Sequence, residues 1–517
     1  MSGSGVKREV SGLATRKGRS GRGISTEGSE AIAAERCTDA ADGEAGRSGV
    51  TARLSVEIPP WTVTPSPRVL EVCLRFGLPM VMEGRQVCRD LRIDPRPGTI
   101  TLITGPSGSG KSMLLAEIAR RFPAAREVGR LPFPTDVSVL DAVAPTRGLD
   151  EALAILTACG LGEPMLWVRG FRQLSDGERF RARLARAISL QLRERATAPL
   201  LVDEFGAVLH RRLARSMAFN LRKLASRCSL ALVLAAAQDD VVGELAPDTV
   251  IRLGEGDPEV TLHDMERRRP TSSLARRFRI ARGTLRDYAL FAPMHYRKRD
   301  NLGFIDRVFV LREGAQGPIA GIVVYGRPSL ELTLRNLATG NRFRKDPGRL
   351  NRELRVLKRL VIHPDLRGCG LGRYLVERTL PQAGTRFVEC LATMGAVHPV
   401  FDRAGMRRIG TVRAPASRDD AVGKLARMGV DPLDADFASH VRRRPTVRRI
   451  VSESVRAWYR STTACGEGRI ARQTATTLAQ TFRQLAGSQP VYFLWARDEQ
   501  GWQLIDEQAM NPAVDTK

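Results

Sequence analysis

The segment that most constrains the fold is an eight-residue loop, Gly105–Ser112, with the sequence GPSGSGKS. Its three glycines let consecutive backbone amides surround phosphate groups, while Lys111 supplies positive charge and the Ser112 hydroxyl supplies a ligand for Mg²⁺. A short apolar run, Ile100–Ile103, precedes the loop, and a helical pattern follows it. The loop therefore predicts a site for ATP and Mg²⁺. Its predicted binding residues are Gly105, Pro106, Ser107, Gly108, Ser109, Gly110, Lys111 and Ser112.

Composition limits the class of protein. The chain has 517 residues, of which 43% are hydrophobic, which is enough for two or three domains with separate cores. The formal net charge of +26 favours a polyanionic partner such as a nucleic acid; a general arginine bias is the alternative. No apolar run approaches the roughly 18 residues of a membrane span. The eight cysteines form no C-x-x-C pair, so we expect a reduced, cytoplasmic protein.

Composition shifts along the chain predict five regions. A disordered basic arm is expected over 1–53, an ATPase domain over 54–255 and a basic linker over 256–284. A second folded domain is expected over 285–413, and a basic region of unassigned fold over 414–517. In the first domain, short apolar runs such as Leu200–Val202 alternate with helical patterns, which predicts a doubly wound α/β sheet.

Further motifs follow the phosphate loop in an order that resembles ABC-type ATPases over roughly residues 54–255. Leu174–Glu178 reads LSDGE and is similar to the family signature. The resemblance implies that Ser175 and Gly177 hold the γ-phosphate bound by a second subunit, so an ATP-dependent homodimer is expected. Helix N-terminal amides suit this task.

Leu200–Glu204 reads LLVDE and matches the family's second phosphate-site strand. By resemblance, Asp203 binds Mg²⁺ through water and Glu204 polarises the attacking water. Phe76 takes the place of the aromatic residue that stacks on adenine. Gln238 stands where the family has a histidine, and His210 stands where it has an aspartate. These two departures predict slow hydrolysis, and Arg126–Val143 lacks the glutamine of transporter-coupling loops.

A second glycine-rich loop, Arg367–Gly372, has the sequence RGCGLG. A strand-like segment ending at Pro364 precedes it, and the helical pattern Arg373–Thr379 follows. Backbone amides at a helix N-terminus converge on pyrophosphate in such a loop. With His398–Met406 downstream, the order resembles the GNAT acetyltransferases over roughly 285–413.

The GNAT resemblance implies acetyl-CoA, or another acyl-CoA, as a cofactor. Its pantetheine arm would pair with the main chain of Leu360, Val361 and Ile362. Its pyrophosphate would lie on the loop residues Arg367, Gly368, Cys369, Gly370, Leu371 and Gly372. Phe401 stands where the family often has a tyrosine acid, and phenylalanine has no proton to donate.

Three residues are candidates for acid–base chemistry in this half. His295 and Tyr296 lie in a basic cluster, where they suit a base and a stacking surface for a nucleic-acid substrate. The alternative is a packed helix with solvated arginines. Glu389, in the strand-like segment Arg386–Leu391, is a second candidate base.

The predicted fold class is therefore an α/β ABC-type P-loop domain followed by an α+β GNAT domain, an order that resembles a prokaryotic family of ATPase–acetyltransferase fusions. Three functions follow from the pairing. The first is an ATP-dependent acyltransferase acting on a nucleic-acid base. The second is a protein or small-molecule N-acetyltransferase gated by the ATPase. The third is a non-enzymatic clamp on DNA or RNA.

Overall fold

The computed structural model describes residues 51–254, 257–262, 273–296, 302–412, 416–462, 473–487 and 489–510, and all of them belong to one compact unit, Gly49–Lys517. The expected N-terminal arm, up to residue 50, and the arginines at 267–269 of the expected linker lie outside the described residues. Within the described part, no helix has the length and apolar character needed to cross a membrane.

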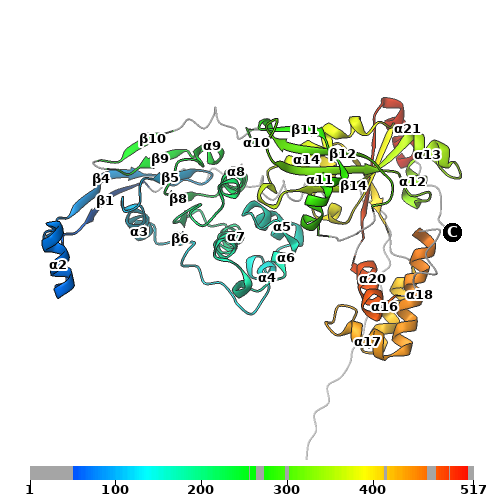
Figure 1. The fold of residues 1–517 in the computed structure, drawn as a ribbon, viewed down its shortest axis with the longest axis horizontal. Helices are drawn as coiled ribbons and strands as arrows, with labels where there is room; N and C mark the ends of the chain where they lie inside the picture. The colour runs from blue at the N-terminus through cyan, green and yellow to red at the C-terminus, as the bar shows by residue number, and fades with distance from the viewer. Residues whose placement is uncertain are drawn as a thin grey trace, which may run out of the picture. The chain divides into compact units, whose positions relative to one another are not determined.

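The first half is built on a six-stranded sheet in the order β10-β9-β5-β8-β7-β6 (Figure 1). All neighbours are parallel except β9 and β10. The strands are β5 (Ile100–Thr104), β6 (Arg126–Glu127), β7 (Leu200–Val202), β8 (Leu232–Ala236), β9 (Thr249–Arg252) and β10 (Glu259–Leu262). The predicted strands at 100–103 and 200–202 are thus present.

Helices cover both faces of this sheet, because its central strands are apolar on both sides. Leu102 of β5 packs into one core cluster and Ile103 into another. The helices are α3 (Lys111–Arg121), α4 (Val139–Val143), α5 (Leu149–Ala158), α6 (Pro164–Trp167), α7 (Asp176–Glu194), α8 (Arg211–Cys228) and α9 (Val242–Leu245). The doubly wound arrangement places the residues that follow β5, β7 and β8 at one edge of the sheet.

An antiparallel ladder of β1 (Ala52–Ile58) and β4 (Arg85–Ile93) precedes the sheet. Between these strands the chain forms β2 (Trp61–Thr62), α2 (Pro67–Phe76) and β3 (Val81–Met82). The Ser66 hydroxyl caps α2, and Gly77 ends it in the left-handed conformation. Strand β1 begins at Ala52, inside the range expected to be a disordered arm.

The second half contains a seven-stranded sheet in the order β11-β12-β13-β14-β15-β17-β16. All neighbours are antiparallel except β14 and β15, which run parallel. The strands are β11 (Phe278–Arg282), β12 (Ile305–Glu313), β13 (Ile319–Gly326), β14 (Leu354–Ile362), β15 (Phe387–Ala392), β16 (Arg407–Thr411) and β17 (Val491–Ala496). Seven helices accompany them: α10 (Ser273–Arg276), α11 (Leu285–Phe291), α12 (Thr333–Ala338), α13 (Pro347–Glu353), α14 (Leu371–Thr379), α15 (Val400–Arg403) and α21 (Glu499–Met510).

Both sheets extend beyond the ranges expected from sequence. Strand β10 joins the first sheet and β11 joins the second, although both lie in the expected linker, 256–284. Strand β17, from the region of unassigned fold, pairs with both β15 and β16. Strand β17 thus lies between β15 and β16 although it begins about 80 residues after β16 ends. The region of unassigned fold therefore contributes to the second sheet.

Among the described residues between β16 and β17, four helices form a group of their own: α16 (Ala416–Arg427), α17 (Phe437–Arg443), α18 (Pro445–Thr462) and α20 (Ala475–Gly487) (Figure 1). Valines four residues apart on α18, namely Val447, Val451 and Val455, pack with Phe437 and Phe482 in a core cluster of their own. We call residues 416–487 the helical insert.

Candidate functional site

The loop Gly105–Ser112 lies between β5 and α3, as its sequence predicts. Gly105, Gly108 and Gly110 all have positive φ angles, of 149°, 78° and 99°. A β-carbon at Gly110 would lie 2.7 Å from Cγ1 of Val87 on β4. Glycine is therefore required for both backbone conformation and close packing. The loop turns its amides toward the N-terminus of α3, where an anion is stabilised.

Lys111 closes over this loop. Its Nζ donates hydrogen bonds to the carbonyl oxygens of Gly105, at 2.8 Å, and Pro106, at 2.7 Å. The adjacent Ser112 hydroxyl is on an exposed residue in the first turn of α3. An ammonium group held at the centre of the loop, with a hydroxyl beside it, fits a triphosphate carrying Mg²⁺.

Two carboxylates follow β7 at the same sheet edge. Asp203 and Glu204 are exposed, and Glu204 has a φ angle of 51°. The Glu204 amide donates to Asp203 Oδ1 at 2.9 Å, which fixes the turn between the two side chains. Strand β5 leads into the phosphate loop, and β8 lies between β5 and β7. One strand therefore separates the carboxylates after β7 from the phosphate loop.

Gln238, which follows β8, is also exposed at this edge. Its neighbour Asp239 accepts a short hydrogen bond from the Thr104 hydroxyl and another from Arg252 Nε at 3.3 Å. Thr104 is the last residue of β5, directly before the phosphate loop. Asp239 thus holds the segment containing Gln238 against the loop. Sequence reasoning missed this contact because 135 residues separate Thr104 and Asp239.

The signature-like segment forms the N-terminus of α7. Ser175 is the N-cap, and its amide donates to Glu178 Oε2 at 2.8 Å while its hydroxyl accepts from the Glu178 amide. At Gly177, a β-carbon would lie 3.0 Å from the Val208 carbonyl oxygen. Helix α7 packs against α4, α5 and β7, whereas α3 packs against β1 and β8. The signature and the phosphate loop therefore lie on different elements of one protomer.

The aromatic residue expected at the adenine is Phe76, and the structure places it at the end of α2 with 74% of its surface exposed. Trp61, which follows β1, is 54% exposed. Trp61 is three residues beyond Ile58, which pairs with Arg85 in the ladder of β1 and β4. Arg85 in turn contacts the phosphate loop, because its Nη2 donates a hydrogen bond to the Gly108 carbonyl at 3.0 Å. Trp61 thus lies beyond the end of the ladder that contacts the phosphate loop. Its position three residues after an alternating strand was the available sequence signal.

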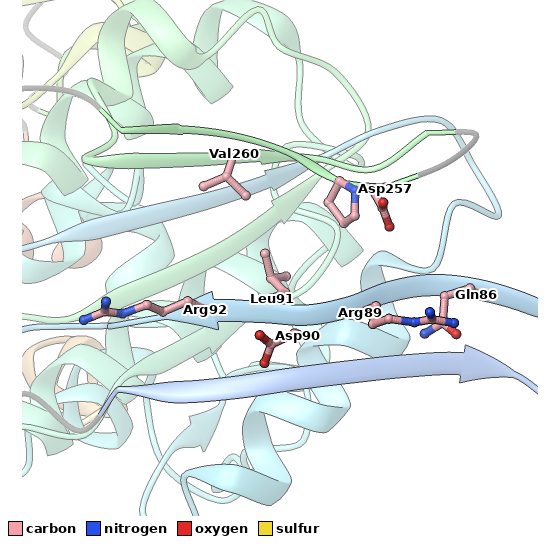
Figure 2. A pocket seen from close by; sticks show the side chains of 8 residues that line it. Gln86, Arg89, Asp90, Leu91, Arg92, Asp257 and Val260 are labelled. Carbon is pink, nitrogen blue, oxygen red and sulfur yellow. The ribbon is translucent and has the colours of Figure 1, made fainter.

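A cavity of about 710 Å³ lies beside β4 (Figure 2). Gln86, Arg89 and Arg92 line it from β4, and Asp257 and Val260 line it from the segment at β10. It contains none of the predicted nucleotide-binding residues. Among the described residues, no group of three or more His, Cys, Asp or Glu side chains suits a metal ion.

In the second half, β14 and β15 pair only over their first three residues, Leu354–Val356 with Phe387–Glu389. Beyond Val356, the edge of β14 that faces β15 has no ladder partner in that sheet, while the other edge pairs with β13 as far as Ile362. Leu360, Val361 and Ile362 belong to this diverging part. Without a ladder partner from β15, this edge suits an extended ligand that adds to it, although the Ile362 carbonyl already accepts a hydrogen bond from Arg367 Nε.

The second glycine loop follows directly. Gly368 and Gly370 have φ angles of 84° and 80°, and Gly370 caps α14, so the loop ends at a helix N-terminus as predicted. Both glycines are exposed, and a β-carbon at Gly370 would meet no atom within 4 Å. Cys369 is buried, and burial raises the pKa of its thiol to about 12, so this cysteine is not a nucleophile.

The guanidinium of Arg367 donates hydrogen bonds to backbone carbonyls. Nε donates to Ile362 at 3.1 Å, Nη1 to Gly162 at 2.7 Å and Nη2 to Met294 at 2.9 Å. Burial lowers its pKa. Asn220 of α8 donates to the Arg367 carbonyl at 3.2 Å. Arg367 therefore shapes the loop, and the glycine amides are the groups left for an anion.

The predicted acid–base residues His295 and Tyr296 follow Met294, whose carbonyl accepts a hydrogen bond from Arg367. The rings of His295 and Tyr296 stack with centroids 4.7 Å apart, and Tyr296 is 45% exposed. The fold thus brings these two residues and the second glycine loop together, although about 70 residues separate them in the sequence.

Glu389 is in a different environment. It is buried, with Arg335 Nη1 at 3.1 Å from Oε1 and the Tyr492 hydroxyl at 3.0 Å from Oε2. Burial raises the pKa of Glu389, and Arg335 opposes that shift. Phe401 is also buried, with its ring centroid 5.4 Å from that of Phe493. Neither side chain reaches solvent, so their positions favour structural roles.

Residues 94–241 match the model of a protein family described as an AAA domain. The chain is 32% identical over 127 residues to the zinc import ATP-binding protein ZnuC of Ruegeria pomeroyi, covering 22% of this chain and 50% of that protein. It is 30% identical over 183 residues to the hemin import ATP-binding protein HmuV of Rhodococcus jostii, covering 28% and 61%. The chain thus spans about half to three fifths of the length of these relatives.

Two solved structures are also similar. The protein cbiO1 from Clostridium perfringens, part of an ABC transporter complex, is 18% identical with a TM-score of 0.27, covering 34% of this chain and 81% of that chain. A dimeric bacterial ABC transporter cassette is 19% identical with a TM-score of 0.28, covering 35% and 92%.

Proposed function

We propose that residues 94–241 belong to an ABC-type P-loop ATPase domain, that the protein hydrolyses ATP between two copies of itself, and that it transfers an acyl group from acyl-CoA to a nucleic-acid base. The ATPase part is supported by the phosphate loop, the carboxylates after β7 and the signature on α7. The transferase part is supported above all by the divergence of β14 from β15 next to the second glycine loop.

For ATP hydrolysis, each residue has a separate task. Arriving phosphates replace the carbonyl partners of Lys111, whose ammonium then neutralises phosphate charge. Ser112 and Asp203 would hold Mg²⁺, which would offset negative charge on the phosphates. Glu204 orients the attacking water and accepts its proton. Gln238 hydrogen-bonds the γ-phosphate but, unlike histidine, takes up no proton.

For acyl transfer, the β14 edge and the loop amides orient acyl-CoA. The acceptor nitrogen attacks the thioester carbonyl, a new C–N bond forms, and the C–S bond breaks. The nitrogen loses one proton and the leaving thiolate gains one. His295 is the candidate base because Glu389 is enclosed. Phe401 has no proton to give, so water protonates the thiolate.

The net charge of +26 supports a nucleic-acid acceptor. A protein or small-molecule amine is the alternative acceptor, and a clamp without acyl transfer is the non-enzymatic one. Incubation of the protein with ATP and labelled acetyl-CoA, alone and with RNA, DNA or free amines, tests these possibilities. We expect label in nucleosides. Label only in amines selects the alternative acceptor, and binding of acetyl-CoA without transfer selects the clamp.

A further inference from the structure

The helical insert presents an unusually basic surface. Residues 441–456 contain six arginines and one acidic residue, Glu453, for a formal net charge of +5 (6 − 1). The six arginines are all exposed: Arg442, Arg443, Arg444, Arg448, Arg449 and Arg456. They lie at the junction of α17 and α18 and along the solvent side of α18, and we call them the arginine surface.

The geometry of α18 separates these arginines from the core. Val447, Val451 and Val455 form the buried stripe, and Arg449 and Arg456 project from the opposite face. These two arginines are seven residues apart, which is two helical turns, or about 11 Å along the axis. All six arginines are exposed, and none belongs to the core cluster of the insert.

The arginine surface also lacks internal counter-charges. Within the described residues, the ion pairs of the insert involve Arg418, Lys424 and His440, and none involves the arginine surface. Exposed arginines on other helices do have partners, such as Arg120 with Glu117 and Arg373 with Glu377. The guanidinium groups of the arginine surface thus keep their donors for an external anion.

We propose that the arginine surface binds the phosphodiester backbone of a nucleic acid. Arginine offers a planar fork of donors that matches phosphate oxygens, and each neutralised phosphate releases counterions. A lipid surface fits less well, because membrane-surface helices place large apolar side chains beside their basic ones. Here the exposed neighbours are Pro445, Thr446 and Glu453. The proposal deepens the nucleic-acid part of the proposed function and does not depend on acyl transfer.

The test compares two variants of the full-length protein, each lacking four charges. One is Arg442/Arg443/Arg448/Arg449→Gln. The matched control is Arg193/Arg344/Arg349/Arg352→Gln, at exposed sites outside the insert. Fluorescence anisotropy measures binding to a labelled DNA duplex, its single strand and the corresponding RNA between about 50 and 300 mM salt. Melting temperature and ATP binding report whether each variant is folded.

For the insert variant, we expect the slope of log Kd against log salt for duplex DNA to fall by about 3 to 4, since each phosphate contact contributes about 0.9. The control should keep the wild-type slope. Equal slopes in the two variants, or binding to anionic lipid vesicles in place of nucleic acid, would overturn the proposal. Acetyl-CoA affinity, measured separately, shows whether the transferase proposal fails on its own.

Discussion

Glu389 shows how one buried contact changes the interpretation of a residue. Its carboxylate lies inside the second sheet, between Arg335 of α12 and Tyr492 of β17. Arg335 is fully buried, and its Nη2 also donates to the carbonyls of Ser329 and Leu330. The pair therefore links three segments of the chain and belongs to the framework of the sheet.

Arg335→Met should destabilise this sheet strongly, because it leaves a buried carboxylate without its cation. The expected loss is about 3–5 kcal/mol in the local unfolding free energy. Hydrogen exchange of the β15 and β17 amides measures it. The double variant with Glu389→Gln should recover part of the loss, since the uncompensated charge is gone. A loss below about 1 kcal/mol, as for exposed pairs, would contradict this role.

Trp61 and Phe76 are two candidates for stacking on adenine. If the base stacks on Trp61, Trp61→Ala should weaken ATP binding by about 1–3 kcal/mol. Phe76→Ala serves as the matched control and should leave the affinity unchanged, because Phe76 ends a separate helix. Calorimetry with ATP decides between them. A larger effect from Phe76→Ala would instead support the assignment of Phe76 made from sequence.

At the scale of elements, Gly370 tests the second loop. Gly370→Leu places a side chain where the pyrophosphate is expected, and its φ angle of 80° adds strain of about 1–3 kcal/mol. Acetyl-CoA binding should be lost while ATP binding persists. Gly314→Leu is a suitable control, since Gly314 has a φ angle of 69° in the turn between β12 and β13. Wild-type acetyl-CoA affinity in Gly370→Leu would refute the site.

His295→Ala separates binding from chemistry at the same site. If His295 accepts the proton of the acceptor nitrogen, its loss should lower the rate of acyl transfer by about 10²–10⁴-fold. Acetyl-CoA affinity should stay unchanged, because the coenzyme contacts are backbone groups. An unchanged transfer rate would return His295 to a packing role beside Tyr296.

The sequence predicted correctly those elements that are determined by residues close together in the chain. The phosphate loop follows from glycine spacing, and β5 and β7 follow from short apolar runs between polar turns. The pairing of β17 with β15 and β16 has no local cause, because the helical insert separates β17 from both in sequence. The partners of Glu389 could not be predicted for the same reason: Arg335 and Tyr492 are 54 and 103 residues away in sequence.

At the scale of the whole molecule, the residues of the proposed ATP site are divided between two surfaces. The phosphate loop is on α3, and Ser175 and Gly177 are on α7, which packs against different elements. A second copy in head-to-tail orientation would bring each signature to the other protomer's loop. Two copies arranged in this way would form a closed dimer with two ATP molecules at its interface.

The second half is attached to this ATP-dependent part through α8. Ser216 donates to the Asp365 carbonyl, and Asn220 donates to the Arg367 carbonyl. Helix α8 begins seven residues after Glu204. The segment after Asp203 and Glu204 therefore leads directly into the helix that contacts the second glycine loop, which gives a physical connection between the two proposed sites.

The ATP-dependent dimer is tested most directly by the molecular mass of Glu204→Gln with Mg²⁺ and ATP. Removing the base should stop hydrolysis without blocking ATP binding, so light scattering after gel filtration should show a dimer with ATP and a monomer without it. Lys111→Ala should stay monomeric under both conditions, because it does not hold the phosphates. A strictly monomeric Glu204→Gln variant that nevertheless binds ATP would contradict the account.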